Sequence, residues 1–439
     1  MNGNALHTRE YVAVILIGLL PAWMILLPLD MTSDPEGWQV FVRSNSFAVP
    51  LAQLMFVLLA MSIRFSPFKS IRQLPHITKA AVLIWLIVAG FVSFQGGKDH
   101  LSALIGLVKI IIASLFLLAL VNLRVTYGSR LLSILWIAVG TGAVLYTALW
   151  TIHIFMVSPQ GDEWIYRIPG VNNVRHTGHF AIAGVIGGLS TFLAFRNNSN
   201  IWLGWILPSF FAIAGLGLAL WTGSRGPLLA SLMTMFVTIC VAVQQRKVVA
   251  GFCVVVVLAT TATVALLPVP HPIYGIAGAT GFADLSQSAG YDASSGRTEL
   301  WKGTMAKIAE RPMLGWGLNQ FGTVEFSKKD SYLHPHNYPL QLMFSGGLFS
   351  VLVLLLIALP VVKQSDWRLI KGPGAAGVGG VVGIVIYSLY DGSLYFSYPV
   401  MIFLVAIATS IKPASKPPVD DRSGSPSRTG SNAASRSPR

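Results

Sequence analysis

Long apolar runs separated by short polar segments dominate this chain of 439 residues. A membrane core about 30 Å thick requires roughly 20 mainly apolar residues of helix, and most of the runs approach or exceed that length. The pattern predicts an all-α, polytopic membrane protein with about 12 transmembrane helices. The expected spans cover residues 11–28, 47–63, 80–95, 101–121, 131–157, 178–195, 201–221, 226–243, 248–268, 337–362, 374–390 and 394–411.

One polar stretch, residues 269–335, is far longer than the other connections. It contains a helical pattern that begins near Ser295, with Glu299 in the first turn, and ends before Pro312. The apolar positions Trp301, Met305 and Ile308 are expected to form one face of that helix. We therefore expect a transmembrane domain over residues 1–411, interrupted between its ninth and tenth spans by a large loop that contains helices. Residues 412–439 are rich in Ser, Pro, Arg and Gly and are expected to be a disordered tail.

The charges of the connecting segments predict the orientation of the chain, because cytoplasmic loops carry an excess of Lys and Arg. With a cytoplasmic N-terminus, the inner segments hold Arg9, Arg64, Lys69, Arg72, Lys79, Arg124, Arg130, Arg196, Arg246, Lys247, Lys363, Arg368, Lys371, Lys412 and Lys416. The short outer segments hold fewer basic residues, namely Arg43, Lys98, Arg167, Arg175 and Arg225, and many acids: Asp30, Asp34, Glu36, Asp99, Asp162, Glu163 and Asp391. Both ends of the chain are therefore expected in the cytoplasm, and residues 269–335 outside it.

Composition agrees with a membrane protein and argues against some other classes. Only 11% of the residues are charged, against roughly a quarter in soluble domains. The formal net charge is +14, but the basic residues are spread among short loops and form no continuous stripe, so no nucleic-acid partner is expected. Cys240 and Cys253 lie inside apolar runs and are expected to be buried, with no disulfide or metal framework.

Three outer arginines are candidates for binding an anionic group. Arg225 lies in the turn Thr222–Pro227 and Arg297 at the start of the helix in the long loop, and a helix N-terminus already favours an anion. Arg175 lies in a third polar segment that runs into a span. The alternatives are an interfacial Arg225 that reaches to lipid headgroups, a local salt bridge of Arg297 to a neighbouring acid (Glu299 or Asp292), and a solvated Arg175.

Histidines supply a second kind of candidate group. His334, His336 and Asn337 stand where the long loop returns to the membrane, and a histidine there can accept a proton near neutral pH. Asn337 could contact a sugar hydroxyl, and a histidine bonded to a backbone carbonyl is the alternative for His336. A metal site is not expected, because no cysteine or carboxylate pair completes one. His176 and His179 would share a helical face, and the role of Lys109, about two turns inside its span, stays open.

Several of these segments resemble the O-antigen ligase and polymerase family. The residues that carry the resemblance are Ser224-Arg225-Gly226, Gly296-Arg297-Thr298-Glu299-Leu300-Trp301, Arg311-Pro312-Met313-Leu314-Gly315-Trp316-Gly317, and His336-Asn337-Tyr338-Pro339-Leu340-Gln341 with Gly346-Gly347. Their order and spacing fit the end of the family's large periplasmic loop, and they cover about residues 220–350. Tyr338-Pro339 departs from the family's usual aromatic and leucine pattern.

The resemblance implies an inner-membrane glycosyltransferase whose active site faces the periplasm. It implies a polysaccharide donor on undecaprenyl diphosphate, a lipid A–core acceptor, and a metal-independent inverting transfer with no cofactor. It further implies that Arg225 and Arg297 hold the diphosphate and that His336 is the base, with Arg225 counted among the catalytic residues. Arg175 is added to the diphosphate-binding set on charge and position, and His334 and Asn337 are possible substrate contacts.

Three other functions remain open at this stage. An O-antigen polymerase and a protein O-oligosaccharyltransferase would use the same donor, so the sequence cannot separate them from a ligase. A secondary transporter, which belongs to a different class, would also have many spans and an intramembrane lysine. Transporters usually contain internal repeats with interrupted helices in both halves, and no such repeat is visible here.

Overall fold

The computed structural model describes residues 11–12, 14–15, 17–18, 35–63, 65–157, 171, 173–280, 297–324, 333–364 and 372–411. Its helices confirm the expected all-α polytopic membrane fold. Among the described residues, eight helices are long and apolar enough to cross a membrane. Shorter apolar helices occupy Phe47–Ser62, Arg225–Val241 and Ser397–Ser410.

The helices follow the expected spans closely from residue 47 onward. Their bounds are α2 Pro35–Ile63, α3 Pro67–Gln73, α4 His76–Gly96, α5 His100–Tyr127, α6 Ser129–Val157, α8 Gly178–Phe195, α9 Leu207–Trp221, α10 Arg225–Val241, α11 Arg246–Leu266, α12 Gly275–Thr280, α14 Arg297–Glu310, α15 Tyr338–Gln364, α16 Pro373–Asp391 and α17 Ser397–Ser410. The expected first span, residues 11–28, lies mostly outside the described residues, and so does the tail 412–439.

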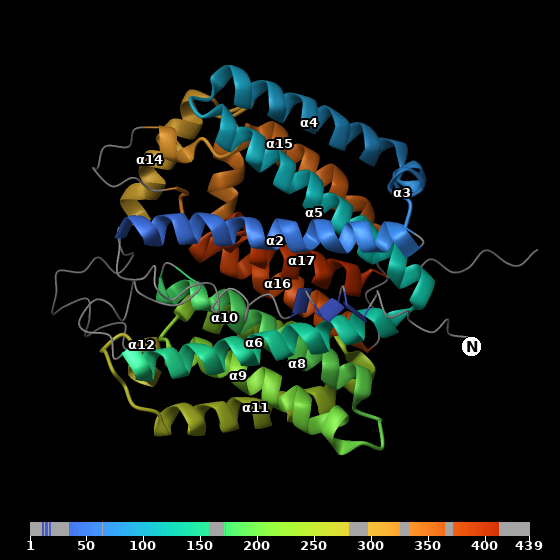
Figure 1. Cartoon of the computed structure of the whole chain (residues 1–439), viewed down its shortest axis with the longest axis vertical. Helices are drawn as coiled ribbons and strands as arrows, with labels where there is room; N and C mark the ends of the chain where they lie inside the picture. Colours follow the sequence, from blue (N-terminus) through green and yellow to red (C-terminus); the bar gives the residue numbers. More distant parts are fainter. Residues whose placement is uncertain are drawn as a thin grey trace, which may run out of the picture.

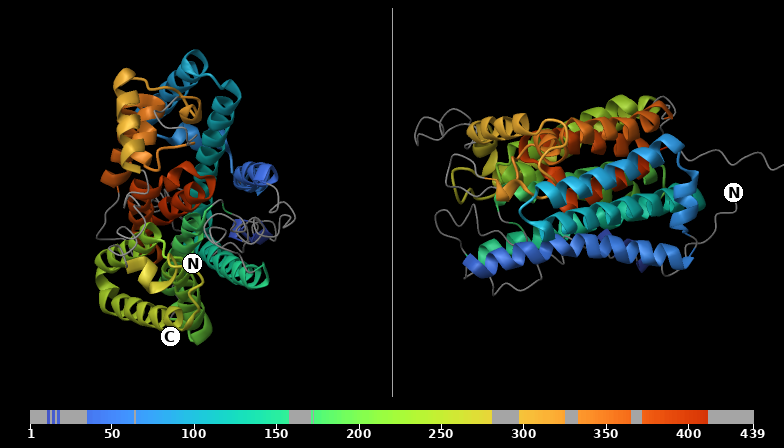
Figure 2. Two further views of the ribbon diagram at one scale, coloured as in Figure 1. Left: turned by 90° about the vertical axis from the view of Figure 1, so that its left-hand side faces the viewer. Right: turned by 90° about the horizontal axis from the view of Figure 1, so that it is seen from above.

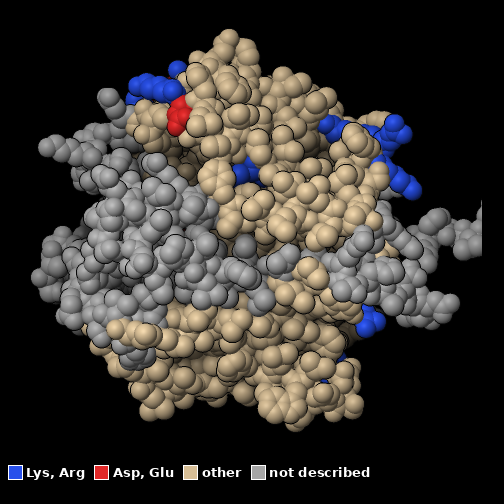
Figure 3. All heavy atoms as spheres, viewed as in Figure 1, with Lys and Arg blue, Asp and Glu red and all other residues tan. Residues whose placement is uncertain are grey.

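The long helices run in broadly the same direction, so the bundle has two ends (Figures 1 and 2). Helices α12 and α14 lie at one end, which we call the α14 end, and α3 lies at the opposite end. The helices of the long polar loop are thus gathered at one end of the bundle. On the face drawn in Figure 3, the described surface between the two ends is mainly uncharged; basic side chains lie mostly toward the ends, and one basic patch lies between them. That distribution suits a bundle surrounded by lipid.

Helix α8 is the centre of the bundle, and nearly all of its residues are buried. Its glycines allow neighbouring backbones to approach, because a Cβ at Gly188 would lie 2.7 Å from the carbonyl oxygen of Pro208. A Cβ at Gly215 of α9 would likewise lie 2.4 Å from the carbonyl oxygen of Ala181. Small residues at such crossings are what helix packing in membranes requires, since van der Waals contact replaces the hydrophobic effect there.

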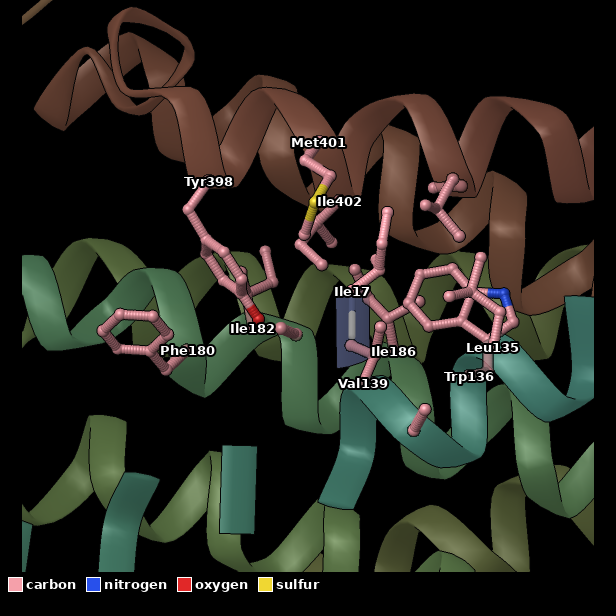
Figure 4. Packing of buried hydrophobic residues seen from close by; sticks show 14 of the residues in the cluster. Ile17, Leu135, Trp136, Val139, Phe180, Ile182, Ile186, Tyr398, Met401 and Ile402 are labelled. Atoms are coloured by element: carbon pink, nitrogen blue, oxygen red, sulfur yellow. The ribbon is translucent and has the colours of Figure 1, made fainter. Parts of the chain in front are cut away.

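A large apolar cluster joins α17 to α8 and α6. Figure 4 shows Tyr398, Met401 and Ile402 of α17 facing a layer that Phe180, Ile182 and Ile186 of α8 form with Leu135, Trp136 and Val139 of α6 and with Ile17. The Trp136 indole donates a hydrogen bond of 2.9 Å to Thr409 Oγ1, which satisfies its one polar atom inside the core. This cluster fixes α17 against the central helix, and α16 packs beside both.

The long loop is hydrogen-bonded to a break inside α15. Gly347 has a φ of 59°, which interrupts the helix and leaves backbone groups on both sides of the break without helical partners. The N–H groups of Trp316 and Gly317 donate to the carbonyls of Phe344 and Ser345, at 2.8 and 3.0 Å. In return, the N–H groups of Leu348 and Phe349 donate to the carbonyls of Pro312 and Met313, at 2.9 and 3.1 Å. The turn after α14 therefore takes the place of the missing helical bonds.

One sequence-based expectation about side chains is met only in part, and another is wrong. In α14 the buried residues are Leu300 and Thr304; Trp301 and Ile308 of the expected stripe are half-buried, whereas Met305 is 52% exposed. The reason is that the helix packs on the loop and on α15, where Leu300 joins Phe321 and Phe344. Cys240 is exposed on the outside of α10, because the apolar surroundings expected for it are supplied by lipid rather than by protein.

Candidate functional site

A buried carboxylate organises the α14 end of the bundle. Asp391 is the last residue of α16, and its side chain is only 6% exposed. Its Oδ1 lies 3.1 Å from Arg297 Nη2 and 3.8 Å from His336 Nδ1. Its Oδ2 accepts a hydrogen bond of 3.0 Å from the hydroxyl of Tyr387. One carboxylate therefore joins residues that are far apart in sequence, from α14, the loop before α15, and α16.

Arg297 reaches from the first turn of α14 into the membrane bundle. Its guanidinium also donates to the carbonyl of Tyr390, while its side chain stays 20% exposed. Burial lowers the pKa of Arg297, the Asp391 carboxylate raises it, and the positive charge of Arg175 lowers it. The guanidinium is thus partly shielded from water and has a second positive charge nearby. An added anion would stabilise both charges.

Arg175 and Arg225 bring further positive charge to the same place. Arg225 is the first residue of α10, and Arg175 lies in the short helix Val174–Thr177 that precedes α8. The charge of Arg175 lowers the pKa of Arg225 and that of Arg297. The Arg175 carbonyl lies 3.1 Å from the hydroxyl of Tyr387, which ties this short helix to α16. Like charges are costly to hold together, so the cluster is suited to a ligand with more than one negative charge.

Tight backbone geometry sets Arg225 in position. Gly223 has a φ of 63°, and a Cβ there would lie 1.8 Å from the carbonyl oxygen of Ile273. Only glycine fits such a turn. The chain then enters α10 with Arg225 at its N-terminus, as the sequence predicts, where the helix dipole favours an anion.

The segment that contains His336 is held in a strained conformation. His336 has a φ of 52°, which is rare for a residue with a side chain. The backbone N–H of His336 donates to His334 Nδ1 at 3.2 Å, and the His334 ring stacks on Tyr395 at 4.5 Å. Because burial and the neighbouring histidines hold the pKa of His334 well below its usual range, this ring stays neutral and serves as an acceptor. His334 therefore positions His336.

Asn337 also has a positioning role in the structure. Its Oδ1 accepts the N–H of Leu340 at 3.0 Å and so caps the start of α15. Its Nδ2 donates to the carbonyl of Leu389 at 3.0 Å, which links α15 to α16. Gly392 makes this contact possible, because a Cβ there would lie 3.0 Å from His334 Nδ1 and 3.2 Å from the Asn337 nitrogen. The loop and the end of α16 are in close contact at this point.

A second histidine pair borders the site. His176 and His179 stack with ring centroids 5.5 Å apart, on one face of the short helix and the first turn of α8, as the sequence predicts. Phe396 packs on both rings, at 4.7 and 5.0 Å. The charges of Asp391, His336 and Arg297 interact electrostatically with His176. The pair therefore packs against Phe396 beside the site.

The structure thus brings together the residues singled out from the sequence, and it adds two. Arg297 and His336 both lie beside Asp391, and the charge of Arg175 acts on Arg297. The alternative salt bridge between Arg297 and Glu299 is not formed, because the Glu299 carboxylate lies 3.8 Å from the Lys302 ammonium instead. Asp292, the other alternative partner, lies outside the described residues, as does Ser295.

The loop charges predict an outer position for Asp391, but the sequence patterns indicate no role for Asp391 or for Tyr387. One signal was present, namely a carboxylate at the end of an apolar run followed at once by a glycine. A carboxylate at that depth requires a partner.

Chemically, the site offers several guanidinium groups, a histidine and one carboxylate. Among the described residues, no group of three or more His, Cys, Asp or Glu side chains is placed to hold a metal ion. Guanidinium groups bind phosphate oxygens in pairs, and a histidine oriented by a carboxylate can accept a proton. The arrangement is suited to binding a phosphorylated group beside a proton acceptor.

Comparison with known families agrees with the resemblance found in the sequence. Residues 210–356 match a family model described as O-antigen ligase, and the match confirms that resemblance. The matched range contains Arg225, Arg297 and His336, whereas Arg175 and Asp391 lie outside it. No curated protein matches the chain. The matched region is accordingly similar to that of glycosyltransferase-like ligases and polymerases of membranes.

Proposed function

Because residues 210–356 match a family model described as O-antigen ligase, we propose that this protein is an O-antigen ligase of the bacterial inner membrane. It transfers a polysaccharide from undecaprenyl diphosphate to lipid A–core on the periplasmic face. The observation that carries the proposal is the position of Asp391, which joins Arg297 and His336 at one end of the bundle. An anion-binding group and a proton acceptor are thereby placed side by side.

The arginines bind the diphosphate of the donor. Arg297 and Arg225, with Arg175 beside them, present several N–H donors to phosphate oxygens from three different elements. As the glycosidic bond to the diphosphate breaks, negative charge grows on the leaving oxygen. Guanidinium groups already in place stabilise that charge without reorganisation, which is how fixed donors lower a barrier.

His336 accepts the proton of the attacking sugar hydroxyl. The Asp391 carboxylate lies 3.8 Å from Nδ1, longer than a hydrogen bond, and favours the tautomer that carries its proton on Nδ1. Nε2 is then the acceptor. The hydroxyl oxygen forms a bond to the anomeric carbon while the bond to the diphosphate breaks on the opposite side, so the configuration inverts. Hydrogen bonds of this kind often shorten only when substrate is bound.

The test is transfer by the purified protein in proteoliposomes with undecaprenyl diphosphate-linked polysaccharide and lipid A–core, with and without a chelator. We expect polysaccharide on lipid A–core in both conditions. His336→Ala and Arg225→Ala should each lower the rate at least about 100-fold. Lys302→Ala, which removes an exposed charge from the same loop helix, is the matched control and should have no effect.

Other outcomes of that experiment would overturn the proposal. Full activity of both His336→Ala and Arg225→Ala would remove the proposed site. A product made of longer lipid-linked chains would identify a polymerase, and a glycosylated protein an O-oligosaccharyltransferase. Movement of a solute across the membrane without a glycosylated product would indicate a transporter. The lipopolysaccharide of a deletion strain gives the same distinction in the cell, because a ligase mutant retains polymerised lipid-linked glycan.

A further inference from the structure

Tyr387 of α16 is completely buried, and its hydroxyl lies between two acceptors. The residue precedes Asp391 by four positions, so the two side chains lie on one face of the helix. The hydroxyl oxygen is 3.0 Å from Asp391 Oδ2 and 3.1 Å from the carbonyl oxygen of Arg175. A phenol has one O–H, so a single proton is shared between a carboxylate and a backbone carbonyl. Because the side chain is 0% exposed, it cannot touch a ligand bound at the site.

The carboxylate acceptor connects Tyr387 to Arg297. The hydroxyl of Tyr387 holds Oδ2 of Asp391, and Oδ1 of the same carboxylate lies 3.1 Å from Arg297 Nη2. The terminal torsion of an aspartate has broad energy wells, so a carboxylate held at one oxygen only can rotate. The tyrosine hydroxyl therefore fixes the direction in which Oδ1 meets the guanidinium.

The carbonyl acceptor connects Tyr387 to Arg175. The Arg175 N–H donates to Asn173 Oδ1 at 2.9 Å, so both polar groups of this peptide segment have side-chain partners. The bond from Tyr387 is made to the main chain of Arg175. It sets the point from which the arginine side chain extends and does not occupy the guanidinium.

The ring of Tyr387 packs against two helices that begin at the site. A Cβ at Gly226, the residue after Arg225, would lie 3.4 Å from Cδ2 and Cε2 of the ring. A Cβ at Gly178 would lie 2.8 Å from the hydroxyl oxygen and 1.9 Å from Pro227 Cγ. Glycine at this position lets the first turns of α8 and α10 close on each other and on the tyrosine. The ring therefore places Arg225 through the residue beside it.

We propose that Tyr387 is a positioning residue that aligns the three arginine-bearing elements for a diphosphate. The inference rests on the proposed function for the identity of the ligand. A diphosphate carries oxygens on two phosphorus atoms, so guanidinium groups from several elements bind it fully only when those elements keep their relative positions. A monophosphate requires fewer of these groups. Tyr387 thus determines the preference for a diphosphate over a monophosphate and touches neither.

Binding of two lipids tests the proposal without catalysis. The purified full-length protein in nanodiscs is titrated with undecaprenyl diphosphate and with undecaprenyl phosphate. Tyr387→Phe keeps the ring and removes the hydroxyl, so the Kd of the diphosphate should rise about tenfold and that of the monophosphate less than about threefold. Replacing Tyr387 by 4-aminophenylalanine supplies two N–H donors, one for each acceptor, and should restore the wild-type preference. A role in stability alone would raise the two Kd values equally.

Tyr398→Phe is the matched control for the loss of a buried hydroxyl. Tyr398 is also buried, and its hydroxyl has no hydrogen-bond partner within the part of the chain that the structure describes. Its removal should leave both Kd values unchanged. A double variant adds a second measurement, because Tyr387→Phe already releases the carboxylate that holds Arg297. The effect of Arg297→Gln on the Kd of the diphosphate should fall from about tenfold in wild type to about threefold in the Tyr387→Phe background.

The outcomes separate this inference from the proposed function. If wild type prefers the diphosphate in a way that depends on the Tyr387 hydroxyl but transfers no glycan, the positioning role stands and the ligase proposal fails. If transfer proceeds and Tyr387→Phe keeps the wild-type preference, the positioning role fails alone. A wild type without the preference, equal rises of the two Kd values, or full additivity with Arg297→Gln would also overturn it. Should Tyr387→Phe not fold, the 4-aminophenylalanine variant decides, because a folded protein with the preference supports the role and one without it contradicts the role.

Discussion

At the scale of single residues, the site depends on one carboxylate serving three partners. Asp391 pairs with Arg297, lies beside His336 and accepts a hydrogen bond from Tyr387. Arg297 and His336 could be singled out from the sequence because each stands in a short polar motif. Asp391 could not, because its partners are 94 and 55 residues away in the chain and only the fold brings them together.

Replacing Asp391 tests whether the carboxylate acts on the histidine. Asp391→Asn keeps the size of the side chain but removes the charge that favours the Nδ1-protonated tautomer of His336. We expect the kcat of glycan transfer to fall on the order of 100-fold with a smaller change in donor KM. Steady-state kinetics in proteoliposomes measures this. Glu310→Gln, which breaks an exposed ion pair with Lys307, should leave both constants unchanged, and equal losses in the two variants would contradict the role of Asp391.

The buried ring of His334 predicts how stability depends on pH. Its pKa is lowered in the folded protein, so below about pH 6.5 the unfolded chain binds a proton that the folded chain does not. The free energy of unfolding should therefore fall as the pH is lowered through that value. His334→Asn keeps an acceptor for the His336 N–H but cannot titrate there, so its Tm should change less between about pH 7 and pH 5. An unchanged slope of Tm against pH in the variant would contradict this.

At the scale of elements, the sequence predicts the helices well and their interruptions poorly. The apolar runs place the helices because bilayer thickness dictates their length. The break at Gly347 in α15 was not expected, since the apolar run continues through it and the compensating hydrogen bonds come from residues 312–317. The inward face of α14 was predicted only in part for a similar reason, because its partners include loop residues with no periodic pattern.

Gly347→Ala tests the link between the loop and α15. Gly347 has a φ of 59°, and a Cβ there would lie 2.3 Å from the backbone of Met313. We expect the variant to lose about 2 kcal/mol or more of stability, and the loop to become more sensitive to protease. Gly251→Ala in α11 is the control, since a Cβ there meets nothing within 4 Å and helix propensity favours alanine. A Gly347→Ala protein as stable and as protease-resistant as wild type would show that the break is dispensable.

At the scale of the whole molecule, the account requires that α14 and α3 lie on opposite sides of the membrane. The charge distribution of the loops predicts that α14 lies outside the cytoplasm. Lys302 on α14 and Arg72 on α3 are both exposed, so each can carry a single cysteine in a background without Cys240 and Cys253. In intact cells, an impermeant maleimide should label the Lys302→Cys protein and should reach Arg72→Cys only after permeabilisation. The reverse pattern would place the site on the cytoplasmic side.

The central claim is that Arg225 and Arg297 bind one diphosphate together, and its affinity tests this most directly. The Kd of undecaprenyl diphosphate should rise about tenfold or more in Arg225→Gln and in Arg297→Gln, and Lys302→Gln should match wild type. Because both guanidinium groups act on one ligand, the double variant should depart from the sum of the two single effects. Unchanged Kd values in both single variants would contradict the account.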